Sequence, residues 1–254
     1  MPLIAATHRC HVLLAVVTRR LPDRLTIGHT GRVPEYEDRP RALQLAARVE
    51  KTDPPELADV FGAAALGVIM MLDHAKSLPG GEWHDDVAAW NGSRIRKIMR
   101  RARASAWQRA QEVSGLTVRH GTAEVRIFVP GIIEDAPPEL SKLQIQSTPL
   151  DEPEPTSTLE PVNGPTLTVA LDPAVEMSWG KRGAQVAHAS QRLWEQLDRS
   201  DRLNWNAASR PVRVLTPTGQ LWEELVAAAP VVIKDGGFTE IAPGTRTCCA
   251  LLSG

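Results

Sequence analysis

Residues 166–190, TLTVALDPAVEMSWGKRGAQVAHAS, contain the pattern that decides the fold. The first seven residues predict a strand, and residues 180–198 predict the helix that follows it after a short loop. The alternation of strand and helix then continues: we expect a helix at 218–229 and strands at 211–217, 230–235 and 246–252. Such alternation is typical of a layered α/β domain with mostly parallel strand pairing.

The chain divides by composition before this region. Residues 151–165, DEPEPTSTLEPVNGP, are rich in Pro, Glu, Ser and Thr and have almost nothing to bury, which indicates a linker. We therefore expect a C-terminal three-layer α/β/α domain with a four-stranded mixed sheet at 166–254, preceded by a separate α+β domain at 41–150. Residues 1–40 lack sustained periodicity and are expected to be an N-terminal extension.

The predicted α+β domain has a strand near 42–50, an apolar helix at 55–75 and a hairpin formed by 116–120 and 123–129. A second helix is expected to begin near Glu82 and to continue through a basic stretch, RIRKIMRRARASAWQR, at 94–109. Such an unbalanced basic helix fits a polyanion, so we expect it to bind nucleic acid. Its cations are Arg94, Arg96, Lys97, Arg100, Arg101, Arg103 and Arg109.

The overall composition is that of a globular protein. The 254 residues have a formal net charge of -1, and 43% of them are hydrophobic. The three cysteines, Cys10, Cys248 and Cys249, offer no disulfide framework, which favours a cytoplasmic setting. The apolar run at 60–72 is shorter than the roughly 20 residues of a membrane span, so no membrane partner is expected. His8, Cys10 and His11 have no second ligand cluster, and we expect no metal.

Two polar clusters follow predicted strands. Lys181, Gln185 and His188 lie at i, i+4 and i+7 and therefore share one helix face. A Lys in the first helical turn opposes the helix dipole, which suggests that it holds a phosphate or a developing oxyanion. The second cluster, KDGGFTEIAPGTRT at 234–247, contains Asp235 as a candidate base and Thr239 as a nearby hydroxyl. The structural alternatives are the start of a surface helix with incidental polar groups for the first cluster, and a simple turn for the second.

The two clusters together resemble the second, archaeal and eukaryotic, type of peptidyl-tRNA hydrolase. The similarity rests on GKRGAQVAHA and on DGGFTEIAPGTRT about 50 residues later, and it covers about 165–254. It implies hydrolysis of the ester between a peptide and tRNA without metal or organic cofactor. The implied catalytic residues are Lys181, Asp235, Thr239 and His188, with His188 equally open to a structural or substrate-contact role. The candidate substrate-binding residues are Gln185, Arg96, Lys97, Arg100, Arg103 and Arg246.

Two other functions remain open on the sequence. The chain has Trp179 where the family commonly has a basic residue, and Phe238 and Glu240 where it has Arg and Gln. These differences motivate the alternative of a catalytically inactive tRNA- or ribosome-binding protein. The apolar helix at 55–75 motivates a self-associating scaffold, and a homodimer is an arrangement that this helix would allow.

Overall fold

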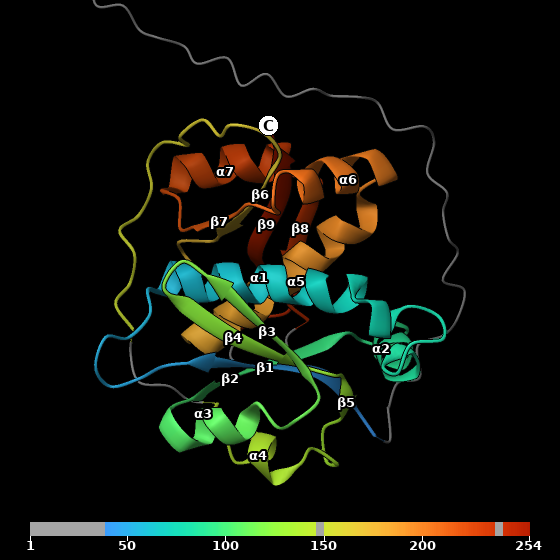
Figure 1. The fold of residues 1–254 in the computed structure, drawn as a ribbon. Helices are drawn as coiled ribbons and strands as arrows, with labels where there is room; N and C mark the ends of the chain where they lie inside the picture. Colours follow the sequence, from blue (N-terminus) through green and yellow to red (C-terminus); the bar gives the residue numbers. More distant parts are fainter. Residues whose placement is uncertain (1–38, 146–149, 237–240) are drawn as a thin grey trace, which may run out of the picture. The chain divides into compact units, whose positions relative to one another are not determined.

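The computed structural model describes residues 39–145, 150–236 and 241–254, which lie in one compact unit (Figure 1). The first sheet has the order β2-β1-β4-β3, and the short β5 pairs with β1. Only β1 and β2 are parallel; β4 is antiparallel to both β1 and β3. Its strands are β1 (Arg41–Arg48), β2 (Arg96–Ala102), β3 (Gly115–His120), β4 (Ala123–Phe128) and β5 (Gly131–Ile132).

The second sheet has the order β7-β6-β9-β8. Here β6 and β7 are parallel, whereas β9 is antiparallel to β6 and β8. The predicted four-stranded mixed sheet is therefore confirmed, but the expectation of mostly parallel pairing was wrong, because β9 returns between β6 and β8. The strands are β6 (Thr166–Leu171), β7 (Val212–Leu215), β8 (Val231–Lys234) and β9 (Arg246–Ser253).

The helices complete two successive units of the same topology. The first unit runs β1, α1, α2, β2, α3, β3, β4, and the second runs β6, α5, α6, β7, α7, β8, β9. Strand order and strand direction are the same in both sheets, so the fold contains an internal structural repeat. The helices are α1 (Leu57–Asp73), α2 (His84–Asn91), α3 (Ala104–Ala110), α4 (Pro138–Ser141), α5 (Trp179–Gln196), α6 (Arg199–Ala207), α7 (Gly219–Ala228) and the 3-10 turn η1 (Ala75–Ser77).

A tryptophan contact repeats in both units. Trp90 of α2 and Trp205 of α6 are fully buried, and each indole N–H donates to the carbonyl six residues later, at 2.9 Å in both cases. The residues before these carbonyls, Ile95 and Arg210, both have a positive φ, of 46° and 55°. The same strained turn thus leads into the edge strand of each sheet, which supports the repeat at the level of single residues.

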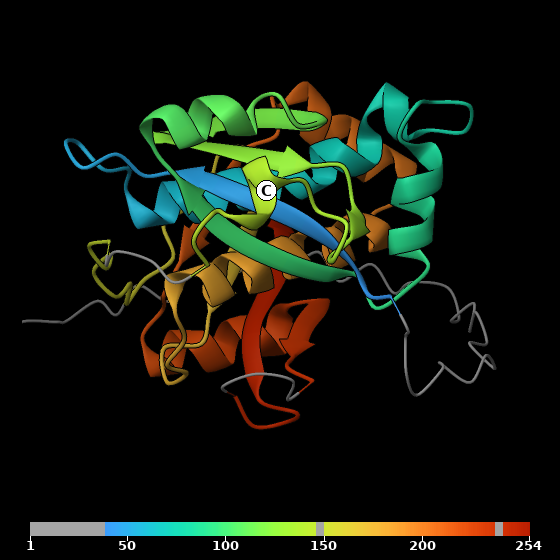
Figure 2. The ribbon, with the colours of Figure 1, turned by 90° about the horizontal axis from the view of Figure 1, so that it is seen from below.

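The two sheets enclose a shared layer formed by α1 and α5 (Figures 1 and 2). Leu43 and Leu45 of β1 and Leu167 and Val169 of β6 all point into this layer and belong to one hydrophobic cluster. Helices α3 and α4 cover the outer face of the first sheet, and α7 covers the outer face of the second. The predicted helix at 55–75 is apolar on nearly every side because a sheet lies on each side of α1.

The region expected to be a separate first domain shares its core with the second. The hydroxyl of Ser190 in α5 donates to the carbonyl of Ala65 in α1, at 3.1 Å. The proline-rich segment at 151–165 lies beside β7, where the amide of Thr156 donates to the carbonyl of Thr216 at 2.9 Å. The two units therefore have one continuous core and a closely packed connection.

The predicted basic helix was wrong. Helix α2 ends at Asn91, and residues 96–102 form β2, paired in parallel with β1. Alternation along β2 places Met99 in the shared core and Arg100 on the outer face. Arg, Lys, Met and Ile have adequate helix propensity, but pairing with the buried β1 outweighs that local preference. The predicted hairpin is confirmed as β3 and β4.

Several predictions fall on residues that the structure does not describe. These are the N-terminal extension with His8, Cys10 and His11, and the loop residues Phe238, Thr239 and Glu240. Among the described residues, no helix combines the length and the apolar character needed to cross a membrane.

Candidate functional site

Lys181 and Asp235 form an ion pair at the carboxyl end of the second sheet. Nζ of Lys181 is 2.8 Å from Oδ2 of Asp235, and the side chains are 18% and 5% exposed. Lys181 lies in the first turn of α5, and Asp235 follows β8 directly. The structure thus brings together two residues that the sequence predicted for one site.

Gln185 binds the same carboxylate from within the core. Its Nε2 donates to Oδ2 of Asp235 at 2.8 Å, and its Oε1 accepts from the hydroxyl of Thr247 at 3.1 Å. Thr247 is fully buried. Gln185 is therefore placed to orient Asp235, in contrast to the substrate-binding role expected for it.

Backbone hydrogen bonds fix both ends of this site. The amide of Asp235 donates to the carbonyl of Thr245 at 2.8 Å, and the amide of Gly244 donates to the carbonyl of Asp235 at 2.7 Å. On α5, the hydroxyl of Ser178 caps the helix by accepting from the amide of Lys181 at 3.3 Å. Both charged side chains thus start from a constrained backbone, which limits the conformations open to them.

Trp179 packs into the core and is 5% exposed. Its large apolar side chain fills the space between the layers at the start of α5 and adds contacts to the core.

His188 lies one turn beyond Gln185 on the same helix. Burial lowers the pKa of its imidazole to about 3, and the positive charge of Lys97 is the next largest cause. The imidazole is therefore neutral throughout the physiological range. A neutral His188 can pack or contact substrate, and this pKa argues against an acid–base role for it.

Lys97 reaches the same helix from the first unit. Its ammonium donates to Oε1 of Gln191 in α5 at 2.5 Å and lies 4.9 Å from the centre of the Trp90 ring. Gln191 in turn donates to Asn91 at 2.6 Å and to Glu195 at 2.9 Å. Burial lowers the pKa of Lys97 to about 7, against the opposing effect of Glu195. Lys97 is thus a partly desolvated cation beside the helix that carries Lys181 and His188.

The remaining predicted binding residues lie apart from the pair. Arg100 is buried on the outer face of the first sheet, where it donates to Gln44 and to the carbonyl of Leu143, at 2.8 Å in both cases. Arg96 lies on the same face of β2 by alternation, and exposed Arg103 precedes α3. Arg246 pairs with Glu223 of α7 at 2.7 Å on the outer face of the second sheet. These arginines therefore lie outside the Lys181–Asp235 pair, and their role in binding substrate stays a prediction.

The equivalent position in the first unit has different chemistry. Asp59 stands at the same step of α1 as Lys181 does of α5 and accepts from the amide and the hydroxyl of Thr122, at 2.7 and 2.8 Å. His120, the last residue of β3, stands at the place of Asp235, because Val118 and Ile233 occupy matching register positions. The first unit therefore has no counterpart of the Lys–Asp pair.

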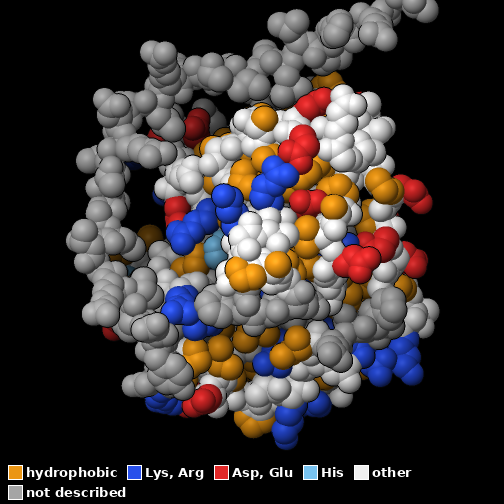
Figure 3. Space-filling model, turned by 180° about the vertical axis from the view of Figure 1, so that it is seen from behind, with side chains coloured by type: hydrophobic (Ala, Val, Ile, Leu, Met, Phe, Trp, Pro, Cys, Tyr) orange, Lys and Arg blue, Asp and Glu red, His pale blue; other side chains and the backbone are white. Residues whose placement is uncertain are grey.

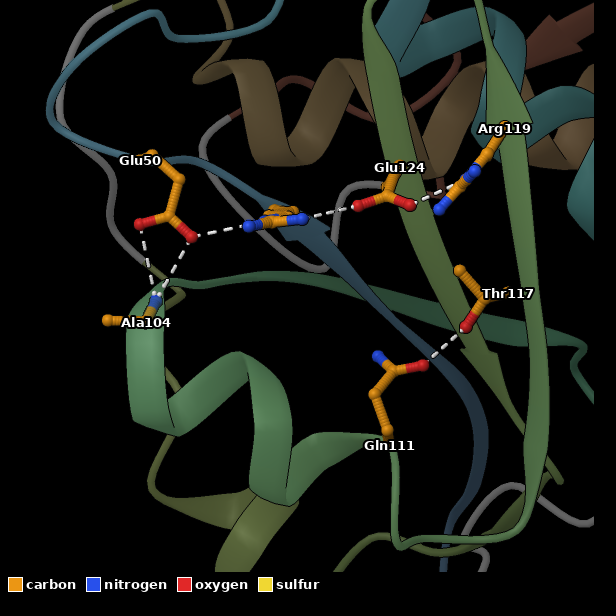
Figure 4. A network of polar contacts seen from close by, with 7 residues as sticks. Glu50, Ala104, Gln111, Thr117, Arg119 and Glu124 are labelled. Atoms are coloured by element: carbon orange, nitrogen blue, oxygen red, sulfur yellow. Dashed lines mark hydrogen bonds and ion pairs between the residues drawn. The ribbon is translucent and has the colours of Figure 1, made fainter.

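An ion-pair network lies close to that altered position (Figure 4). Arg48 donates to Glu50 at 3.0 Å and to Glu124 at 2.7 Å, and Arg119 donates to Glu124 at 2.6 Å. These groups border an open cavity of about 460 Å³. The guanidinium of Arg48 is the main cause that lowers the pKa of Glu124, whereas the amide of Ala104 is the main cause for Glu50. The network is internally balanced in charge.

Sequence reasoning missed Thr247 and misjudged the place of Lys97. Thr247 follows Arg246 in a strand, so alternation alone would have placed one of the two side chains inside the sheet. Lys97 lies in a stretch that was predicted to be a helix, and this prediction did not show that its side chain points toward α5. Both errors arise from neighbours that are distant in sequence.

The chain matches no model of a known protein family, and no curated protein matches it.

Proposed function

We propose that the protein hydrolyses the ester bond between a peptide and tRNA, in the cytoplasm. The observation that carries this proposal is the pair formed by Lys181 and Asp235, 2.8 Å apart, within the motif that resembles the second type of peptidyl-tRNA hydrolase. The pair lies at the carboxyl end of a sheet, where α/β folds usually bind their ligands.

The pair supplies the two functions that ester hydrolysis requires. Asp235 accepts a proton from water while the water oxygen attacks the ester carbonyl carbon. The ammonium of Lys181 moves its hydrogen bond to the carbonyl oxygen and stabilises the negative charge that develops there. Collapse of the tetrahedral intermediate breaks the bond to the ribose oxygen, which takes up the proton held by Asp235, and releases the peptide acid. No step in this sequence uses a metal or an organic cofactor.

Surface charge supports a local contact with nucleic acid. Lys and Arg side chains form separate groups on the face seen in Figure 3, with hydrophobic and acidic side chains between them. In the first unit, Arg103 and Arg109 are exposed. We infer that the first unit contributes cations to tRNA binding while the second carries the chemistry. Local groups of this kind steer a polyanion even when the net charge is near zero.

The direct test is release of labelled peptide from an N-blocked aminoacyl-tRNA. Lys181→Ala and Asp235→Ala are each expected to lower the rate by at least about 100-fold, which is the usual loss when one catalytic charge is removed. Lys142→Ala is the control, because Lys142 is exposed beside α4 on the outer face of the first sheet. Unchanged turnover in both site variants would overturn the proposal.

A catalytically inactive tRNA-binding protein is the second candidate. It is favoured by the departures Trp179, Phe238 and Glu240 and by the engagement of Lys181 with Asp235. This function would give tRNA binding that weakens steeply with salt, with no peptide released at any protein concentration.

A further inference from the structure

Lys97 occupies an apolar position of the internal repeat. The register pairs Leu43 with Lys97 in the first sheet and Leu167 with Val212 in the second, so Val212 is the counterpart of Lys97. Val212 is buried in the shared core. A partly desolvated ammonium where the other unit has a valine costs stability, and such a cost usually indicates a function.

Gln191, which Lys97 contacts, is also a polar residue whose counterpart in the repeat is apolar. Gln191 stands at the same step of α5 as Ile69 does of α1, and Ile69 is fully buried. The contact between Lys97 of the first unit and Gln191 of the second thus corresponds, in the repeat, to the pair of Val212 of the second unit and Ile69 of the first. Gln191 holds the ammonium through Oε1 at 2.5 Å and is itself held by Asn91 and Glu195. The cation is therefore supported by groups from two helices, α2 and α5.

The charges around Lys97 leave it attractive to an anion. Glu195 is the nearby carboxylate, and Arg192 pairs with it at 2.8 Å. His188 is neutral. The acceptors that Lys97 itself contacts, Gln191 and the carbonyl of Ile95, are uncharged.

The position of Lys97 extends the candidate site along α5. Gln191 lies ten residues after Lys181, which is about 15 Å along a helix. This length corresponds to roughly four or five stacked nucleotides of a single strand. His188 lies between the two lysines on the same side of α5. Lys181, His188 and Lys97 therefore form a row with a cation at each end and a neutral ring between them.

We propose that Lys97 is a second anion contact of this site and binds a backbone phosphate in the single-stranded end of tRNA whose ester lies at Lys181 and Asp235. The inference rests on the proposed function and names how its substrate is held. The first unit then supplies a substrate-binding residue to the site of the second.

Lys97→Met is the variant that tests this contact, with Lys142→Met as the matched control. Methionine keeps the length of the side chain, and the counterpart Val212 shows that the fold accepts an apolar residue there. In hydrolysis of N-blocked aminoacyl-tRNA, we expect KM to rise about 3- to 10-fold and to change far more than kcat. The slope of log KM against log salt should fall by about 0.7, the value for one phosphate contact of a single strand. Lys142→Met should leave KM and the slope as in the wild type.

The protonation state of Lys97 gives a second readout. The wild-type KM should rise between pH 6 and pH 8, because the ammonium loses its charge over that range, and Lys97→Met should lack this rise. A Lys97→Met protein with the KM, salt slope and pH profile of the wild type overturns the inference while the proposed function stands. If the wild type does not hydrolyse the substrate, the proposed function is overturned. The fluorescence anisotropy of labelled tRNA then tests the Lys97 contact separately, by the affinity of the wild type and of Lys97→Met for tRNA. Equal affinity of these two proteins counts against the contact.

Discussion

Gln185 donates a hydrogen bond to the same carboxylate oxygen of Asp235 that pairs with the ammonium of Lys181. The distance from Nε2 of Gln185 to Oδ2 of Asp235 is 2.8 Å, and both side chains are buried. An amide is a neutral donor, so it fixes the direction of the carboxylate without adding a charge. Gln185 is therefore a positioning residue, and its effect should be separable from that of Lys181.

Replacement of Gln185 by leucine should lower kcat about 10- to 100-fold with little change in KM, because the base loses its orientation while substrate contacts remain. Gln185→Glu should be worse, since a second carboxylate would face Asp235. Steady-state kinetics with N-blocked aminoacyl-tRNA give both values. Ser190→Ala is the control on the same helix, and a loss of kcat as large as that of Gln185→Leu would contradict the positioning role.

The titration of His188 should not affect the pH profile of activity. Its pKa of about 3 keeps it neutral over the whole range of the assay, so His188→Asn should leave the shape of the profile between pH 5 and pH 8 unchanged. A basic limb near pH 6.5 that disappears in His188→Asn would contradict this prediction.

Acid stability should depend on His188. The unfolded chain binds a proton on this residue below about pH 6.5, whereas the folded chain does so only below about pH 3. Stability from this group is thus fully present above pH 6.5 and is lost as the pH falls, by at most about 1.4 kcal/mol per pH unit. Urea titrations of the wild type and His188→Asn from pH 7 to pH 4 should diverge, with the wild type losing more.

Lys97 should make the folded state more stable at alkaline pH. Its folded pKa of about 7 lies below its ordinary value, so the unfolded state binds more protons between pH 7 and about pH 10.5, and stability rises across that range. Lys97→Met should remove this rise and add about 1 to 3 kcal/mol to the free energy of unfolding at pH 6. Lys76→Met is the control, because Lys76 also lies over a tryptophan but is 48% exposed. Equal pH dependence in wild type and Lys97→Met would refute the prediction.

The purified chain should have the mass of one copy in light scattering. The apolar helix α1, which motivated self-association, is covered on both sides by sheets of the same chain. A dimer that persists at submicromolar concentration would show that another surface pairs two copies.

The sequence predicted the second unit well because its elements are local and regular. Strand β6 and helices α5 and α7 lie within about two residues of their expected bounds, and the motif residues Lys181 and Asp235 meet as expected. These predictions depended on alternation of element type and on spacing within a short stretch. Each needs only near neighbours in the chain.

The first unit was harder because its structure depends on distant partners. The stretch from Arg94 to Arg109 has the composition of a helix, yet residues 96–102 form a strand that pairs in parallel with β1. Nothing local marks Ile95 as a turn with positive φ. The repeat itself was hidden because it is carried by strand order, which joins residues that are distant in the sequence. The matching contacts of Trp90 and Trp205 are local, but the sequences around the two tryptophans differ.

The position of α1 between two sheets determines when this protein can finish folding. During synthesis, α1 appears early and can pack at once on β3 and β4, but its other side waits for the second sheet. That sheet is joined by β9, which pairs with both β6 and β8. A chain interrupted before β9 therefore exposes the side of this long apolar helix that the complete second sheet would cover, which is a state prone to aggregation and dependent on chaperones.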